Sequence, residues 1–323
     1  MNTLELEGQL LASVSRSFYL SIRVLPGILR APIGLAYLLA RASDTIADTS
    51  DVPAEIRLQH LARFAEMIQQ GITEGLGPLQ RDIRPEHAGE RTLIDRLGDA
   101  LEWLATISAF DRTEILIVME RIIRGQTLDL ERFAQVEEVV ALGTAEELEE
   151  YTYLVAGCVG EFWTRICLHH LRDYARIEAE PLRQLGVNYG KGLQLVNILR
   201  DLPADLRAGR CYLPEDELRA AGTSPRTLLE HPEAGRAVFD HWHRRAQQLL
   251  DDGRSYIEAL RPARLRIGCF LPWYLGVKTL ALLVEKPPLE TPERVKVPRS
   301  TVRAALAFAP LVAVTNRALG WVK

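Results

Sequence analysis

The chain has 323 residues, of which 47% are hydrophobic and 25% charged, and this composition excludes a disordered or fibrous protein. A formal net charge of -4 gives no general attraction to polyanions, so we expect no binding to nucleic acid. The length is sufficient for a large core, and no Gly/Ser-rich linker divides it, so we predict one domain over residues 1–323.

Helical periodicity dominates the chain, and the alternating β-branched runs typical of strands are scarce. In chain order, we predict helices over residues 3–22, 32–48, 54–70, 91–108, 112–124, 145–170, 179–202, 234–260 and 264–284. Two segments rich in Gly and Pro, 71–89 and 285–300, are predicted to be loops, and such loops often form a lid or rim. The pattern indicates an all-α bundle.

The predicted helix 32–48 carries a polar stripe in an otherwise apolar sequence. Tyr37, Arg41, Asp44 and Asp48 follow a spacing that places them on one helical face. Two carboxylates one turn apart repel each other, which costs a helix a few tenths of a kcal/mol. We therefore expect a positive group beside Asp44 and Asp48.

The predicted helix 179–202 and the residues after it repeat this arrangement. Gln194, Asn197, Asp201 and Asp205 again follow one face and are surrounded by Leu, Ile and Val. A single pair of aspartates at this spacing is commonly a solvated helix face, but two copies in apolar surroundings favour a shared cavity. Pro203 removes an amide donor and is predicted to kink the helix before Asp205.

Carboxylates that converge on one cavity need a compensating cation, because burying even one unpaired carboxylate costs several kcal/mol. Ligands that are all oxygen favour a hard ion such as Mg²⁺, which keeps water and substrate phosphate among its ligands. We therefore predict that Asp44, Asp48, Asp201 and Asp205 bind Mg²⁺ together with a diphosphate.

Four blocks of the sequence resemble those of a known family. "SRSFYL" at 15–20, "YLLARASDTIAD" at 37–48, "YTYLVAGCVGEFW" at 151–163 and "LQLVNILRDLPADLRAGRCYLP" at 193–214 are similar to the signature blocks of squalene and phytoene synthases, in the same order. The resemblance implies the all-α isoprenoid synthase fold, a Mg²⁺-dependent cavity, and head-to-head condensation of two allylic diphosphates through a cyclopropyl intermediate.

The resemblance also implies roles for individual residues. It places Asp44, Asp48, Asp201 and Asp205 at the metal. It assigns Tyr151 to proton transfer or to steering of the cation, although a buried tyrosine with a satisfied hydroxyl is the alternative. It places the following residues near the substrate diphosphates or the cavity wall: Ser15, Arg16, Ser17, Phe18, Tyr37, Arg41, Gln194, Asn197 and Arg200. Small and apolar residues of "LVAGCVGEFW" suit the cavity wall, and Glu161 in that segment has no assigned role.

The product depends on a reductant. Squalene formation needs a hydride, whereas phytoene or dehydrosqualene formation ends in proton loss. "RVKVPRSTV" at 294–302 resembles a basic segment that squalene synthases carry and that is associated with NADPH, with Lys296 and Arg299 at the matching positions. This favours a squalene synthase that uses farnesyl diphosphate; a solvated basic loop is the alternative for this segment.

Three other functions remain open. The first is a phytoene, dehydrosqualene or presqualene diphosphate synthase that needs no reductant. The second is a non-catalytic helical assembly protein, which is disfavoured because both acidic motifs are intact. The third is a head-to-tail prenyl elongation enzyme or terpene cyclase, which is disfavoured because such enzymes typically carry differently spaced motifs such as DDxxD.

The cysteines and the segments near the two ends of the sequence indicate where in the cell the protein is expected. The cysteines lack the spacing of paired ligands, and the N-terminal stretch carries acids where a signal peptide would carry bases. We expect a cytoplasmic, reduced protein. The apolar segment 304–314 has about half the length of a spanning helix and contains Pro310, so we expect peripheral contact with the inner membrane surface rather than passage across it.

Overall fold

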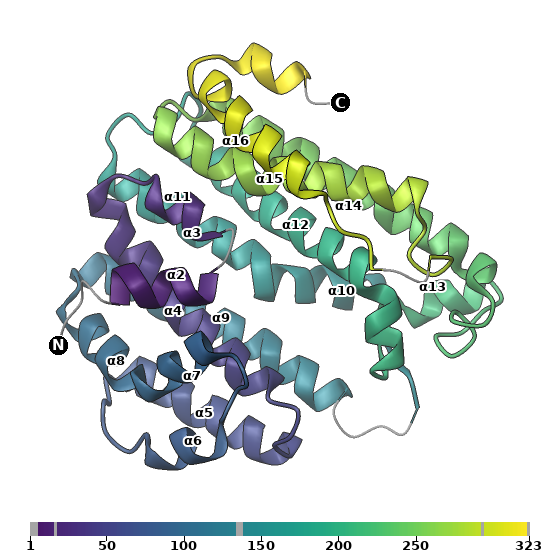
Figure 1. Ribbon diagram of the computed structural model, residues 1–323, viewed down its shortest axis with the longest axis horizontal. Coiled ribbons are helices and arrows are strands. Elements are labelled where there is room, and N and C mark those ends of the chain that lie inside the picture. Colours follow the sequence, from purple (N-terminus) through teal and green to yellow (C-terminus); the bar gives the residue numbers. More distant parts are fainter. Residues whose placement is uncertain (1–5, 16–17, 134–137, 292–293, 322–323) are drawn as a thin grey trace. The chain divides into compact units, whose positions relative to one another are not determined.

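The computed structural model describes residues 6–15, 18–133, 138–291 and 294–321 (Figure 1). The chain forms two compact units, each described by itself below. The first unit comprises Met1–Ala134 with Arg165–Arg172, and the second comprises Gln135–Thr164 with Asp173–Lys323. The prediction of one domain over the whole chain stays a prediction.

The regular elements in the described part of the first unit are all helices. Its elements are a π-helical turn η1 (Leu6–Leu10), α2 (Leu11–Ser15), α3 (Phe18–Arg23), α4 (Gly27–Asp48), α5 (Ala54–Gln70), α6 (Gly77–Asp82), α7 (Ala88–Asp95), α8 (Leu97–Thr106), α9 (Ala109–Phe133) and the second half of α11 (Cys158–His170).

The second unit holds the longest of the described helices and two short strands. Its elements are β1 (Val140–Leu142), α10 (Ala145–Thr152), a π-helical turn η2 (Tyr153–Gly157), the first half of α11, α12 (Ala179–Arg207), β2 (Arg210–Pro214), α13 (Glu215–Ala220), a 3-10 turn η3 (Pro232–Gly235), α14 (Arg236–Ala259), α15 (Ala263–Glu285), α16 (Arg299–Val314) and a 3-10 segment η4 (Asn316–Trp321).

Helix α4 is at the centre of the first unit and packs on α5, α8 and α9. Its apolar side chains Leu35, Leu38, Leu39, Ala42 and Ile46 are fully buried and recur at the spacing of one helical face. The polar stripe of the same helix therefore lies on the opposite side, away from this core.

Helix α12 has the same position in the second unit, where it packs on α14 and α15 (Figure 1). Its contact with η2 and α11 is unusually close, since a Cβ atom on Gly160 would lie 1.9 Å from the carbonyl oxygen of Gly186 and one on Gly190 would lie 2.3 Å from that of Ala156. Small residues of "LVAGCVGEFW" therefore serve helix packing, a use that the sequence analysis did not predict.

The two strands form a short parallel sheet in which Val140 pairs with Arg210 and Ala141 with Cys211. This pairing was not predicted, but it leaves the all-α class unchanged. It fixes the chain directly after α12, and so determines where Arg210 and Tyr212 lie.

Several predicted boundaries are right and others need correction. Helix 54–70 is correct at both ends, where Pro53 precedes the helix and Gly71 adopts a left-handed φ of 69° after it. Helix α4 begins at Gly27 rather than at residue 32, because Leu29, Pro32 and Ile33 are buried on its core face. The predicted loop 71–89 is partly wrong, since it contains α6.

The predicted helix 91–108 is in fact two helices that meet at Arg96. The side-chain amide of Gln80 donates hydrogen bonds to the carbonyls of Ile94 and Asp95, at 3.1 and 3.0 Å. The carbonyls at the end of α7 therefore accept hydrogen bonds from a side chain, and they do not need the backbone amides of a further helical turn. The predicted helix 145–170 is likewise divided by η2.

Pro203 and Pro310 both lie inside helices, and the helix predicted to end at residue 202 is longer than expected. Helix α12 continues through Pro203 to Arg207, because Leu202 and Leu206 are each only 1% exposed and hold the last turns in the core. Helix α16 likewise runs through Pro310. By length and composition, one helix in the described part of the chain, α15, could cross a membrane, and half of its apolar window is buried inside the protein.

Candidate active site

The polar stripe of α4 lies on one face of the helix, as predicted. Arg41 and Asp44 are partly exposed and Asp48 is exposed, and the Arg41 Nη1 atom lies 3.8 Å from Asp44 Oδ2. The hydroxyl of Tyr37 donates a hydrogen bond to the carbonyl of Val14 over 3.2 Å. The stripe is therefore anchored at its Tyr37 end and open at its acidic end.

The surroundings of Asp44 disfavour the charged form of its carboxyl. Desolvation, followed by the charge of Asp48, raises its pKa to about 7, although Arg41 and a hydrogen bond from the side-chain amide of Gln126 favour the charged form. The side chain is 45% exposed, so solvent screens part of this cost. The protein therefore disfavours the charged form of Asp44, and a cation beside this carboxyl would stabilise it.

Among the neighbours of Asp44, Arg41 favours its charged form most, and Arg41 also has a second acidic partner. Its guanidinium forms an ion pair with Glu90 of α7, and this contact raises the pKa of Arg41 against the desolvation that would lower it. Glu90 therefore holds the Arg41 guanidinium beside the acidic pair.

The acidic stripe of α12 is in the opposite electrostatic state. Arg200 binds the Asp201 carboxylate through Nε and Nη2 at 3.0 and 2.6 Å, and Arg294 binds it through the same two nitrogens, each at 2.8 Å. Desolvation would raise the pKa of Asp201, but the hydrogen bonds and charges of the two arginines lower it on balance. Such bidentate contacts are the strongest geometry available to a carboxylate.

Asp205 also has a basic partner, because Arg210 Nη2 lies 3.1 Å from its Oδ1. Arg210 is the first residue of β2, so the small sheet places this cation. Gln194 is partly exposed and Asn197 exposed on the same helix. Both aspartates of α12 are therefore compensated by arginines of the second unit.

Tyr151 lies against Tyr212. The rings stack with centroids 4.9 Å apart, and the Tyr151 hydroxyl is 3.5 Å from that of Tyr212. Glu161, which had no assigned role, accepts hydrogen bonds from Tyr153 at 2.9 Å and from Arg183 at 3.0 Å. Glu161 therefore joins η2 and α11 to α12.

The remaining predicted residues are placed as follows. Arg16 and Ser17 lie outside the described residues, and Phe18 begins α3 with a side chain that is not described. Ser15 is buried and donates a hydrogen bond to the carbonyl of Leu11. Lys296 and Arg299 are exposed on either side of the start of α16.

The sequence analysis missed the partners Glu90, Gln126, Arg210, Tyr212 and Arg294. Arg210 and Tyr212 stand inside a block that was singled out, and Arg294 begins the basic segment "RVKVPRSTV". Gln126 is an amide on the largely apolar buried face of α9, which is a usable signal. Glu90 offers no signal, because nothing in its local sequence relates it to Arg41.

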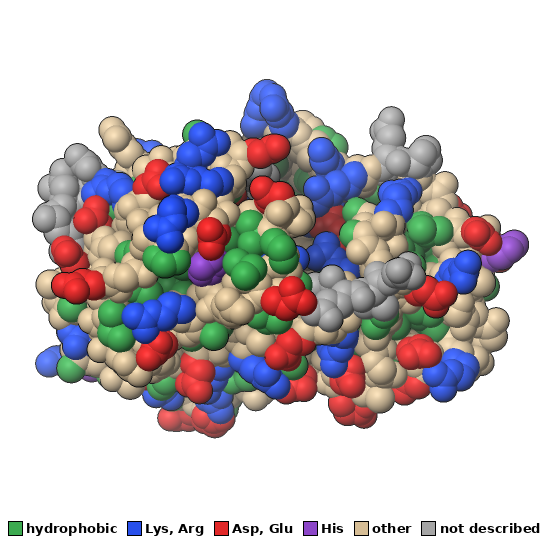
Figure 2. Space-filling model, turned by 90° about the horizontal axis from the view of Figure 1, so that it is seen from below, with side chains coloured by type: hydrophobic (Ala, Val, Ile, Leu, Met, Phe, Trp, Pro, Cys, Tyr) green, Lys and Arg blue, Asp and Glu red, His purple; other side chains and the backbone are tan. Residues whose placement is uncertain are grey.

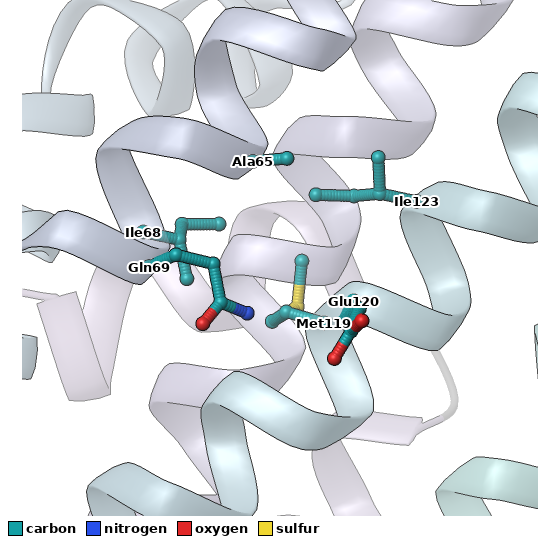
Figure 3. Close-up of a pocket in the computed structure, with 6 residues that line it drawn as sticks. All are labelled: Ala65, Ile68, Gln69, Met119, Glu120 and Ile123. Carbon is teal, nitrogen blue, oxygen red and sulfur yellow. The ribbon is translucent and has the colours of Figure 1, made fainter.

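A groove of about 360 Å³ lies between α5 and α9 in the first unit (Figure 3). It is lined by Ala65, Ile68, Gln69, Met119, Glu120 and Ile123. None of the predicted site residues belongs to it, so it does not correspond to the predicted cavity.

The two acidic pairs are the residues predicted to hold magnesium. In the part of the chain that the structure describes, no group of three or more His, Cys, Asp or Glu side chains lies close enough to hold a metal ion. Asp44 and Asp48 belong to the first unit and Asp201 and Asp205 to the second. The donors are all oxygen, and the raised pKa of Asp44 marks a carboxyl whose charged form a cation would stabilise, so each half suits Mg²⁺. The shared cavity stays a prediction.

The model of the squalene/phytoene synthase family matches residues 11–301. The chain belongs to this family. Its members are head-to-head prenyltransferases that act on prenyl diphosphates and use Mg²⁺. The match spans both acidic helices and the basic segment at 294–299.

Curated relatives carry two different activities in their names. A bifunctional lycopene cyclase/phytoene synthase of Colletotrichum graminicola is 30% identical over 69% of this chain and 36% of that protein. The squalene synthase ERG9 of Saccharomyces cerevisiae is 26% identical over 85% of this chain and 60% of that protein. The chain thus spans about a third to three fifths of the length of these two relatives.

Solved structures confirm the predicted isoprenoid synthase fold. A complex of TcSQS with the ligand BPH1237 matches with a TM-score of 0.79 at 20% identity, covering 100% of this chain and 93% of that one. Squalene synthase HpnC from Alicyclobacillus acidocaldarius matches with a TM-score of 0.64 at 19% identity, covering 90% and 95%. These likenesses show the fold.

Proposed function

We propose that this protein is a squalene synthase, which joins two farnesyl diphosphates head to head through presqualene diphosphate and reduces the product with NADPH. The observation that carries the proposal is the pair of acidic helix faces, each with arginines beside it, in a chain of the squalene/phytoene synthase family. Overall, two farnesyl diphosphates, NADPH and a proton give squalene, two diphosphates and NADP⁺.

The chemistry begins when an allylic carbon–oxygen bond breaks and leaves a diphosphate anion and an allylic cation. Bound Mg²⁺ would stabilise the charge on the leaving diphosphate, and Asp44, Asp48, Asp201 and Asp205 are the residues that would hold it. Arg200 lies beside Asp201 in an orientation that permits bidentate contacts, and its guanidinium is suited to phosphate oxygens that gain charge in the transition state.

Arg41 is held beside Asp44 by Glu90. A cation fixed in advance stabilises developing negative charge without reorganising during the reaction. Ser15, Arg16, Ser17, Phe18, Tyr37, Gln194 and Asn197 complete the proposed substrate-binding set, in which Tyr37 is fixed by its hydrogen bond to Val14.

Tyr151 is proposed to assist proton transfer or to steer the carbocation. Its stacking on Tyr212 presents two aromatic rings, and an aromatic face attracts a cation by about 0.5–2 kcal/mol. Tyr212 holds the Tyr151 ring in place and is thus a positioning residue.

Lys296 and Arg299 are the residues proposed to bind NADPH. Lys296 and Arg299 are exposed, so both are available to the phosphates of a dinucleotide. The alternative is a phytoene or dehydrosqualene synthase that needs no reductant, and it is favoured by the 30% identity to a relative named as a phytoene synthase.

The deciding experiment is to identify the product. The purified protein is incubated with farnesyl or geranylgeranyl diphosphate, with Mg²⁺, and with or without NADPH, and the hydrocarbon is determined by mass spectrometry. We expect squalene from farnesyl diphosphate with NADPH and no turnover in EDTA. Phytoene or dehydrosqualene formed regardless of NADPH would replace the squalene assignment. Absence of any condensation would overturn the enzyme proposal.

A paired variant tests the cofactor. Lys296→Gln is expected to raise the KM for NADPH about tenfold while the rate of presqualene diphosphate formation is unchanged. The matched control is Lys286→Gln, which removes an exposed lysine at the end of α15. An unchanged KM for NADPH would remove Lys296 from the proposed site.

We further propose that the protein works in the cytoplasm at the inner membrane surface. Its substrates carry diphosphates and are accessible from water, whereas a hydrocarbon product of this size partitions into lipid. Contact with a bilayer would give that product a path out of the protein.

A further inference from the structure

We propose that the outward face of α16 together with η4 forms a docking surface for an anionic lipid bilayer, and we call it the C-terminal surface. It is defined by Arg303, Leu306, Leu311, Val314, Arg317 and Trp321. The proposal specifies the membrane contact suggested above, and its evidence comes from this surface rather than from the chemistry of the site.

The C-terminal surface is unusually apolar for an exposed helix. Every residue from Ala304 to Val314 is apolar. The inner face of α16 packs through Ala305, Ala309 and Val312, which are at most 3% exposed. The outer face retains Leu306, Leu311 and Val314, which are 43%, 45% and 79% exposed. The inner side of α16 is therefore buried in the core, whereas the outer side is not covered by any of the described residues.

Large exposed apolar side chains are concentrated in this region. Among the described residues, eight such side chains are exposed, and four of them lie between Leu306 and Trp321. Trp321 is 66% exposed and its ring lies 6.3 Å from that of Phe308, centroid to centroid. Tryptophan is enriched where a protein meets the headgroup region of a membrane.

Charge identifies the kind of partner. From Arg294 to Lys323 the sequence has six basic residues and no Asp or Glu, which gives this segment a formal charge of +6. Because the whole chain has a net charge of -4, residues 1–293 have a net charge of -10. Over the face shown in Figure 2, by contrast, basic and acidic side chains are interspersed. Arg303 and Arg317 are exposed, and neither has an acidic partner in the described part of the chain.

Together these features are typical of a helix that lies in the membrane interface. Its apolar side enters the headgroup boundary, while its arginines attract anionic lipid. A second copy of this chain is a poorer occupant, because two identical cationic surfaces repel each other across a symmetric interface. An anionic bilayer would both bury the apolar side chains of this face and neutralise its arginines.

The test measures binding to vesicles without substrate or Mg²⁺, so that its result is independent of synthase activity. The full chain is mixed with phosphatidylglycerol-containing or pure phosphatidylcholine vesicles and sedimented. We expect binding to the anionic vesicles and at least about tenfold weaker binding to the neutral ones. Equal binding to both, or binding to neither, would overturn the proposal.

Two variants locate the surface. Leu306→Asp with Leu311→Asp is expected to reduce binding about tenfold, and Arg303→Gln with Arg317→Gln is expected to remove the preference for anionic lipid. The matched control is Leu229→Asp, at another exposed apolar position that is 37% exposed. Helical circular dichroism confirms folding of each variant. A loss of binding in the control as large as in the double variants would also contradict the proposal.

Tryptophan fluorescence provides a second readout that needs no mutation. Trp321 is exposed, whereas Trp103, Trp163, Trp242 and Trp273 are at most 8% exposed. A blue shift of the emission and quenching by brominated anionic lipid are therefore expected to come from Trp321. Self-association that Leu306→Asp with Leu311→Asp abolishes, in a protein that leaves vesicles unbound, would assign the surface to a second copy instead.

Discussion

Helices α4 and α12 carry the same acidic pattern in opposite electrostatic states. On α4, desolvation and then the charge of Asp48 raise the pKa of Asp44 to about 7. On α12, Arg200 and Arg294 lower the pKa of Asp201 against its desolvation. Equal spacing of aspartates along two helices therefore does not imply equal chemistry, because the compensating groups come from other parts of each unit.

The difference suggests a division of work between the two helices. On α4 the pKa of Asp44 is raised, so a divalent cation would stabilise the charged form of this carboxyl most. The α12 pair is neutralised by the protein itself, so a metal must share or displace a guanidinium there. The predictions below test this contrast, beginning with the largest expected effect.

The first prediction is that both helices are needed for activity. Asp44→Asn and Asp201→Asn are each expected to lower Mg²⁺-dependent turnover of farnesyl diphosphate on the order of 100-fold or more, because each removes a charged ligand that acts on the developing diphosphate charge. Turnover and helical circular dichroism are measured together.

Asp240→Asn is the matched control for this prediction. Asp240 is an exposed aspartate on α14 that pairs with Arg236 at 3.0 Å, and its removal should leave turnover within about twofold, since exposed ion pairs contribute little. Near-normal activity of either site variant would show that its helix is not part of the metal centre.

The second prediction is that the same substitution has opposite effects on stability in the metal-free protein. The pKa of Asp44 in the folded state, about 7, lies above the unfolded value of about 3.9. The folded state thus holds an extra proton between these values, and this carboxyl costs stability increasingly as the pH rises from about 4 to 7. In EDTA at pH 8, Asp44→Asn should raise the Tm, and the gain should disappear as the pH falls toward 4.

Asp201 should behave in the opposite way. Its folded pKa is lowered, so its contribution to stability is present above the unfolded pKa and is lost as the pH falls through the folded value. Asp201→Asn should therefore lower stability at pH 8 by about 1 kcal/mol, because two arginines lose their partner. Thermal unfolding of both variants as a function of pH checks the signs, and two shifts of the same sign would refute the contrast between the helices.

The sequence was informative about each helix by itself. Periodicity predicted the polar stripes, and Pro53 and Gly71 marked the ends of α5. The helix was predicted to end at residue 202, whereas α12 runs to Arg207; the sequence alone does not show that Leu202 and Leu206 are buried deeply enough to hold these last turns. Burial of neighbouring leucines can outweigh the local preference of one proline.

The electrostatic state of each pair was not predictable from one sequence. Glu90 and Gln126 are far from Asp44 along the chain, and Arg294 is far from Asp201. Periodicity places residues on a face of their own helix and says nothing about which distant side chain meets that face. Gly160 illustrates the same limit, since its role in the close contact with Gly186 is visible only when two helices are packed together.

The third and smallest prediction concerns Arg294, whose contact with Asp201 distinguishes α12 most clearly from α4. Arg294 is 55% exposed, so its ion pair contributes less than about 1 kcal/mol. If it competes with Mg²⁺ for Asp201, Arg294→Gln should lower the Mg²⁺ concentration for half-maximal turnover by about two- to fivefold. Arg226→Gln is the control, since Arg226 pairs with Glu138 at 3.6 Å on the surface of the same unit. An unchanged or higher Mg²⁺ requirement would mean that Arg294 assists the metal site rather than competing with it, and the two helices would then differ less in function than in charge.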